Sequence, residues 1–98
     1  MQMLIIAGFV EVPEAQRDSY VAAFRDLLDR ARRAPGCLDG AITADPLNPA
    51  RVNVYERWES WDHVHAWRAV ANAPDLDIPF LTADVQAYEI ANVRPPFD

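Results

Sequence analysis

The chain has 98 residues, of which 51% are hydrophobic and 24% charged, a balance typical of a globular protein, and we expect one domain over residues 1–98. The formal net charge of −6 disfavours nucleic acid as a partner, and the single cysteine, Cys37, excludes an intrachain disulfide or a zinc site built from several cysteines. We therefore expect a cytoplasmic protein without a membrane partner, because the apolar opening at 3–10 is too short to cross a bilayer.

The first third of the chain predicts a strand followed by a helix. Residues 4–12 are nearly all apolar and rich in branched side chains, and Pro13 follows them, which is typical of a strand covered on both faces. Residues 14–33 repeat apolar side chains at helical spacing with charged ones opposite, which predicts one long amphipathic helix. Pro35 and Gly36 must end it, because proline cannot continue the hydrogen-bond ladder and glycine accepts a left-handed conformation.

The middle of the chain predicts a β-hairpin and a second helix. Strands are expected at 37–44 and 51–59, and the turn-forming residues 45–49 join them. Ser60 is a suitable helix N-cap, because its hydroxyl can accept a hydrogen bond from a free amide of the first turn. Apolar side chains at helical spacing then predict a helix that continues to about Asn72.

The last predicted strand covers residues 82–94, and residues 75–80 are left open as a loop or a short helix. The order β-α-β-β-α-β predicts a ferredoxin-like α+β fold, in which both helices cover one face of a four-stranded antiparallel sheet. Because residues 4–12 are apolar on both faces, the other face also needs a cover. A second copy of the chain would provide it, so we expect a homodimer.

Two motifs carry a resemblance to a known family. One is the Ala-Pro-Gly-Cys-Leu run at 34–38, and the other is the Val-Tyr-Glu-Arg-Trp-Glu-Ser run at 54–60, where the third strand leads into the second helix. Together with the strand and helix before them, they make the chain resemble the antibiotic-biosynthesis monooxygenase family over roughly residues 4–94. The resemblance implies a dimeric α/β barrel in which each subunit holds a pocket between its own sheet and helices.

The resemblance also implies an activity. The polyketide-oxidising members oxidise phenolic rings with dioxygen and no cofactor, because an electron-rich phenolate can itself donate an electron to dioxygen. A tryptophan that lines their pocket corresponds to Trp58, whereas their asparagine four residues earlier is replaced by Val54. No phosphate loop, zinc-peptidase motif or serine-hydrolase motif is present. We therefore predict a monooxygenase that takes a small phenolic or quinol-type aromatic substrate and dioxygen, without a cofactor or a metal.

Two other interpretations stay open. Haem-degrading members carry a tryptophan on the second helix that corresponds to Trp67, but their iron-ligating histidine is replaced by Asp77 and their first-strand asparagine by Gly8 or Phe9. Haem degradation is therefore disfavoured. The other alternative is a non-catalytic domain that binds an apolar ligand or serves assembly, since one fold hosts many functions.

The alternation along 51–59 selects the pocket residues. Val54, Glu56 and Trp58 share the pocket side with Val52, and we expect the opposite side, which includes Asn53, Tyr55 and Arg57, to face the partner. An ionised carboxylate at Glu56 is costly in apolar surroundings unless it is paired. An ion pair with an arginine is the structural reading, and acceptance of a phenolic proton is the functional one.

The aromatic side chains have the same two readings. We expect Trp58 and Trp67 to stack on the substrate ring, with Phe24 and Val64 as further pocket residues, although large side chains at this spacing also serve simply as core.

Three further residues could carry chemistry. His65 lies beside Val64 in sequence, so we expect it to border the pocket mouth and to be the alternative to Glu56 for proton transfer. His63 is expected at the surface, and two histidines at this helical spacing cannot share one metal ion. Cys37 is interpreted as a small buried hydrophobic residue and not as a nucleophile.

Overall fold

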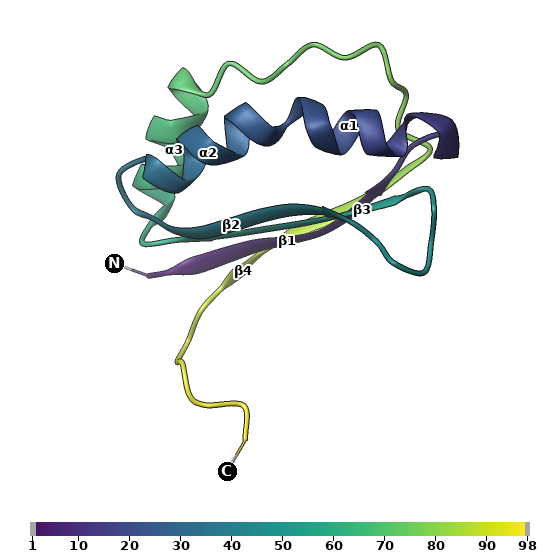
Figure 1. Cartoon of the computed structure of the whole chain (residues 1–98). Coiled ribbons are helices and arrows are strands. Elements are labelled where there is room, and N and C mark those ends of the chain that lie inside the picture. The colour runs from purple at the N-terminus through teal and green to yellow at the C-terminus, as the bar shows by residue number, and fades with distance from the viewer. Residues whose placement is uncertain (1, 98) are drawn as a thin grey trace.

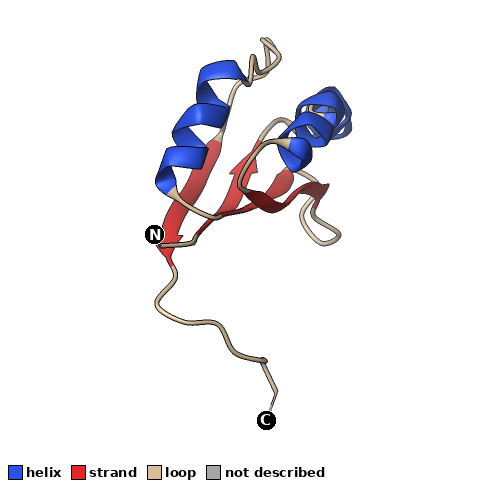
Figure 2. Cartoon of the chain, turned by 90° about the vertical axis from the view of Figure 1, so that its left-hand side faces the viewer, coloured by secondary structure: helices blue, strands red, loops and turns tan. Residues whose placement is uncertain are grey.

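The computed structural model describes residues 2–97 as one sheet with a layer of helices on one face (Figure 1). The strands form an antiparallel sheet in the order β2-β3-β1-β4 and comprise β1 (Leu4–Glu11), β2 (Cys37–Ala44), β3 (Arg51–Trp58) and β4 (Thr82–Glu89). The helical segments are η1 (Glu14–Gln16), α1 (Arg17–Ala23), α2 (Arg25–Arg33) and α3 (Trp61–Val70). Figure 2 shows all of them on the same side of the sheet, which confirms the ferredoxin-like α+β fold.

The core lies between the sheet and the helices and is divided into two clusters. One cluster contains Leu4, Ile6, Trp58 and Val64, and the other contains Val10, Val12, Tyr20 and Val52. Leu4 pairs with Trp58 at one end of the β1–β3 ladder, and Val10 pairs with Val52 near the other end. The alternation predicted for β3 is therefore confirmed, and the middle of this ladder lies between the two clusters.

The single helix predicted for residues 14–33 is wrong in one respect, because three segments replace it. Phe24 separates α1 from α2, and its amide donates to the carbonyl of Val21, three residues back, at 3.2 Å. That is the tighter 3₁₀ spacing, which interrupts an α-helix without a proline. Apolar periodicity alone does not reveal such a break. The two helices still continue in nearly the same direction in Figure 1.

Two other predicted boundaries need correction. The last strand ends at Glu89 and not at Arg94, because Ile90 makes the final ladder bond to the Met3 carbonyl (2.9 Å) and β1 offers no residues beyond it. The helix α3 ends at Val70, and Asn72 follows it with φ of +49°, a left-handed conformation that asparagine tolerates at helix ends. Residues 75–80 form no helix or strand.

Ser60 caps α3 as predicted, and His63, expected at the surface, is only partly exposed, with 30% of its side-chain surface accessible. The Ser60 hydroxyl accepts a hydrogen bond from the His63 amide at 3.3 Å, and it also lies 2.7 Å from His63 Nδ1. His63 is half-buried because its ring packs on Gly36, where a Cβ atom would collide with it. The Pro35-Gly36 boundary thus fixes both the end of α2 and the start of α3.

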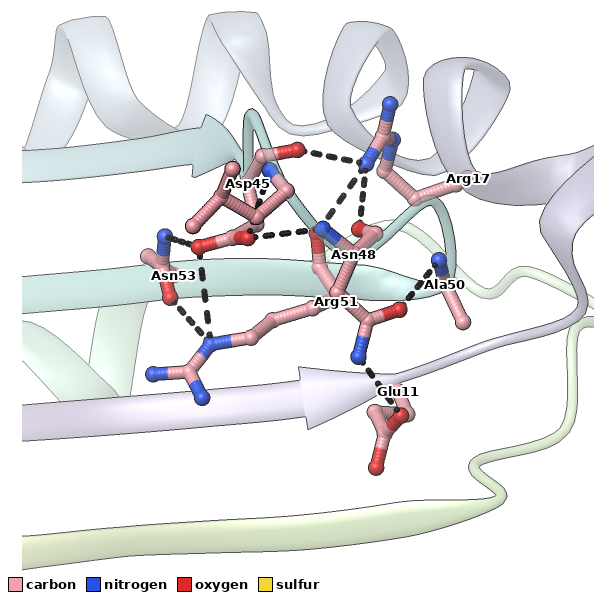
Figure 3. Close-up of polar contacts among 8 residues, drawn as sticks. Glu11, Arg17, Asp45, Asn48, Ala50, Arg51 and Asn53 are labelled. Carbon is pink, nitrogen blue, oxygen red and sulfur yellow. Dashed lines mark hydrogen bonds and ion pairs between the residues drawn. The ribbon is translucent and has the colours of Figure 1, made fainter.

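The β2–β3 turn is held by one carboxylate, that of Asp45 (Figure 3). Its oxygens accept hydrogen bonds from the amides of Leu47 (3.0 Å) and Asn48 (2.9 Å) and from the side-chain amide of Asn53 (2.9 Å). Arg17 donates from α1 to three carbonyl groups of the same turn at 3.0–3.3 Å. These bonds attach the first helix to the hairpin and set the height of α1 above the sheet.

These hydrogen bonds hold the pKa of the Asp45 carboxyl below its usual value, chiefly through Asn53 and then through the two turn amides. A carboxyl with a lowered folded-state pKa contributes stability above its unfolded pKa of about 4 and loses it as the pH falls through the folded value. We expect Asp45→Ala to be less stable than wild type at pH 7, and the difference to shrink below pH 4.

Urea unfolding from pH 7 to pH 2 measures this difference. Asp75→Ala is the control, because Asp75 is exposed, and it should change little at any pH. A constant difference between wild type and Asp45→Ala over the whole range would contradict the prediction.

Candidate functional site

A cavity of about 180 Å³ lies between α2 and α3 above the β2 and β3 side of the sheet. Its walls are mostly aliphatic and aromatic, and its only carboxylate is Glu56. The lining residues are Tyr20, Phe24, Leu27, Leu28, Ala31, Cys37, Gly40, Ala41, Ile42, Val54, Tyr55, Glu56, Trp58 and Trp67. A larger depression along α1 and α2 is open, and four of its seven lining residues are charged, so it lacks the apolar walls of a ligand site.

Glu56 and Trp58 form one hydrogen-bonded unit on β3. Both side chains lie on the helix side of the strand, two residues apart, and Trp58 Nε1 donates to Glu56 Oε1 at 2.9 Å. Trp58 is fully buried, whereas Glu56 is half-buried at the cavity wall. The partner that the structure gives Glu56 is therefore the indole and not the expected arginine.

Aromatic side chains form the wall opposite the sheet. The rings of Tyr20 and Phe24 lie 4.7 Å apart, centre to centre, at the break between α1 and α2. Trp67 reaches the cavity from α3, and the guanidinium of Arg30 lies 5.8 Å from its ring centre. Arg30 also donates to the carbonyl of Ala71 at 2.7 Å, just past the last turn of α3. One arginine thus links the two helices that enclose the cavity.

Burial raises the pKa of two other groups in the wall, Cys37 and Tyr20. It raises the pKa of the Cys37 thiol, and the nearby negative charge of Glu56 raises it further. Burial also raises the pKa of the Tyr20 phenol. Both groups are therefore neutral at pH 7, and Cys37 is a poor nucleophile there. The thiol instead donates weakly to the carbonyl of Asp39 at 3.5 Å.

Comparison with known proteins identifies the family of the chain. The family model described as antibiotic biosynthesis monooxygenase matches residues 3–72. The chain belongs to this family. No curated protein matches the chain.

Several solved structures have the same fold as this chain. A candidate antibiotic biosynthesis monooxygenase from Chloroflexus aurantiacus is 19% identical, with 95% of this chain and 97% of that chain covered and a TM-score of 0.69. A second candidate, from Deinococcus radiodurans, is 17% identical, with 94% and 96% covered and a TM-score of 0.69. The haem degrader MhuD of Mycobacterium tuberculosis, solved with two haems in its active site, is 19% identical, with 97% and 100% covered and a TM-score of 0.65.

The structure brings together most, but not all, of the residues that the sequence suggested for the site. Five of them line the one cavity, namely Phe24, Val54, Glu56, Trp58 and Trp67. Val64 is buried in the core cluster that contains Trp58 and does not line the cavity. His65 is exposed, with its ring 5.7 Å from that of Trp61, and it does not line the cavity either.

Sequence reasoning missed other lining residues, of which Gly40 is the most informative. Leu27 and Ala31 follow Phe24 at helical spacing, and periodicity alone cannot distinguish a packing face of the helix from a cavity wall. Gly40 lies within β2, and a glycine inside a strand often marks a close approach of another group. That signal could have placed the cavity over β2.

Because one of the similar structures is a haem degrader, we asked whether haem would fit this cavity. Drug-sized ligands occupy pockets of roughly 300–1,000 Å³, and haem is at least as large as such ligands. The volume of this cavity is only about 180 Å³. The lining also contains no histidine. Haem therefore does not fit the site in this form. Within residues 2–97, no helix is long and apolar enough to cross a membrane, and no group of three or more His, Cys, Asp or Glu side chains could hold a metal ion.

The bond between Trp58 and Glu56 should be measurable as a coupling energy. In a double-mutant cycle of Trp58→Phe and Glu56→Leu, we expect a coupling of about 1.5–3 kcal/mol, because a hydrogen bond to a charged group contributes that much. Chemical denaturation gives the four unfolding free energies.

Trp61→Phe provides the control cycle with Glu56→Leu. Trp61 is half-buried on α3 and does not line the cavity, so the two substitutions should be additive. Additive effects for Trp58→Phe and Glu56→Leu would show instead that the bond contributes nothing to stability.

Proposed function

We propose that the protein is a cofactor-independent monooxygenase that oxidises a small phenolic or quinol-type aromatic substrate with dioxygen. The observation that carries this proposal is the cavity itself, in which aromatic and aliphatic walls surround one carboxylate, Glu56. Family membership supports it. In this role Phe24 and Trp67 pack on the substrate ring, and Glu56 contacts its hydroxyl group.

The chain's part in the reaction is proton transfer and exclusion of water. Glu56 accepts the proton of the phenolic hydroxyl, and the phenolate donates one electron to dioxygen. The resulting phenoxyl radical and superoxide combine into a carbon–oxygen bond, and the peroxide anion takes the proton back from Glu56. Loss of water then gives a quinone, with one oxygen atom of dioxygen in the product and the other in water. The apolar walls keep bulk water away from these intermediates.

Oxygen consumption tests the proposal. With phenol or hydroquinone, single-ring compounds that suit a cavity of about 180 Å³, wild type should consume dioxygen, and ¹⁸O₂ should label the quinone formed from phenol. Glu56→Gln should lower kcat by about 10²–10⁴-fold, which is the usual contribution of a positioned general base. Glu89→Gln, an exposed carboxylate on β4, is the matched control and should keep wild-type kcat. No oxygen uptake with any phenol or quinol would refute the oxidation.

The alternative is a non-catalytic domain that holds an apolar ligand in the same cavity. It predicts that these aromatic compounds raise Tm without turnover, because a ligand that binds only the folded state stabilises it. The narrow cavity favours this alternative over haem binding, for which haem addition would have to produce a Soret shift that His65→Ala or Trp67→Ala abolishes.

We also propose that the open face of the sheet binds a second copy of the chain. This face includes Ile5, Phe9 and Tyr55, and Tyr88 extends it on β4 with 56% of its surface exposed. The guanidinium of Arg51 covers the ring of Phe9 at 4.0 Å, which leaves a mixed aromatic and charged surface typical of subunit contacts.

Substitution on that face should disrupt self-association. Tyr88→Asp places a charge in the contact, and an unpaired buried charge strongly opposes assembly. We expect a monomer in sedimentation equilibrium at concentrations where wild type is a dimer. Leu47→Asp is the control, because Leu47 is 92% exposed at the tip of the β2–β3 turn. A monomeric wild type would overturn the proposed dimer.

A further inference from the structure

The space beside Glu56 exists because its neighbour across the ladder is a glycine. Gly40 on β2 pairs with Glu56 on β3, and both line the cavity. A Cβ atom at Gly40 would lie 3.3 Å from Leu28 Cδ1 and 3.6 Å from the Tyr55 carbonyl oxygen. The backbone there is outside the left-handed region, so its conformation does not require glycine. What the glycine supplies is room next to the carboxylate.

The Trp58 indole leaves Glu56 with a restricted set of partners. Its N–H is committed to Oε1 at 2.9 Å, which fixes the carboxylate at the wall. Tryptophan has one donor and no acceptor, so Trp58 cannot also donate to a ligand while this bond persists. An ionised carboxylate only accepts hydrogen bonds. A ligand group that enters the space beside Gly40 must therefore donate.

No cation balances this carboxylate from within the wall. None of the lining residues is a lysine, arginine or histidine. Arg32, the nearby cation that acts on Cys37, donates to the Gly40 carbonyl at 2.8 Å, and Arg30 is paired with Asp26 at 2.9 Å. The negative charge of Glu56 also helps to raise the pKa of Cys37, so it acts on other groups of the wall. An anionic ligand would meet repulsion here.

We propose that Gly40 and the Trp58-held carboxylate of Glu56 form a subsite that selects single-ring aromatic ligands with a hydrogen-bond donor and rejects acceptor-only and anionic analogues. The size limit follows from the cavity volume of about 180 Å³, since an apolar cavity of about 150 Å³ binds benzene. This inference rests on one part of the proposed function, namely that the ligand binds in this cavity. Selection is a property of binding and does not require turnover.

Three compounds with the same ring test the selection. They are p-cresol, which donates, 4-methylanisole, which only accepts, and p-toluate, which is an anion. The indole N–H signals in proton–nitrogen NMR spectra report binding, and Trp58→Phe assigns the Trp58 signal. We expect p-cresol to bind wild type at least about ten-fold more tightly than either analogue, because one hydrogen bond to a charged group contributes that much, and to shift the Trp58 signal.

Two variants separate charge from space. Glu56→Gln replaces one acceptor oxygen by an amide donor and removes the charge, so the preference for p-cresol should disappear and p-toluate should bind more tightly. Gly40→Ala reduces the space, so all three affinities should fall while their order stays the same. Glu89→Gln, which lies outside the cavity, should reproduce wild type. Dispersed NMR spectra establish that each variant is folded.

The outcomes distinguish this inference from the oxidation. Selective binding without oxygen uptake supports the subsite and overturns the monooxygenase. Equal wild-type affinities, or a preference that survives in Glu56→Gln, overturn the subsite even if oxygen is consumed. If none of the three compounds binds, both proposals fail, because each needs this cavity to hold a small ring. The wild-type series alone decides the matter if a variant does not fold.

Discussion

The buried indole N–H of Trp58 is the constraint on which the site depends. Trp58 is fully buried at the end of β3, and a buried donor without a partner costs about 1–3 kcal/mol. No core neighbour from Leu4, Ile6 or Val64 offers a side-chain acceptor. Glu56 does, because residues two apart on a strand share a face. A requirement of the core therefore places a carboxylate in an otherwise apolar cavity.

The cavity itself follows from the way the helices divide the core. Two clusters seal the ends of the β1–β3 ladder, and the helix layer breaks at Phe24, which packs against the cluster of Val10, Val12, Tyr20 and Val52. Arg30 links α2 to the end of α3 without filling the space below. Gly40 adds no side chain from β2. The middle of the sheet thus keeps room beside Glu56, while packing on both sides holds the walls in place.

Local patterns in the sequence were sufficient for the sheet but not for every feature of the site. Strict alternation on β3 predicted which side chains face the helices, because the period of a strand leaves two choices. The helix break at Phe24 depends on one amide that bonds three residues back, which apolar periodicity does not encode. The exposure of His65 depends on how α3 rotates about its axis, and that angle is set by packing of Val64 against Trp58. Gly40 could not be recognised from the sequence as part of the site, because it contributes empty space and not a side chain with its own chemistry.

With Val54 in the wall, Glu56 is the only carboxylate or amide side chain in the cavity lining. Polyketide-oxidising relatives carry an asparagine at this position, which both donates and accepts hydrogen bonds. Here Val54 contributes only apolar surface, and the Cys37 thiol is occupied by the Asp39 carbonyl. Under the proposed function, orientation of a ligand therefore depends chiefly on the carboxylate held by Trp58. In the proposed subsite, a fixed acceptor without a cation in the lining discriminates through what the ligand can donate, so the proposed chemistry and the proposed selectivity arise from the same side chain.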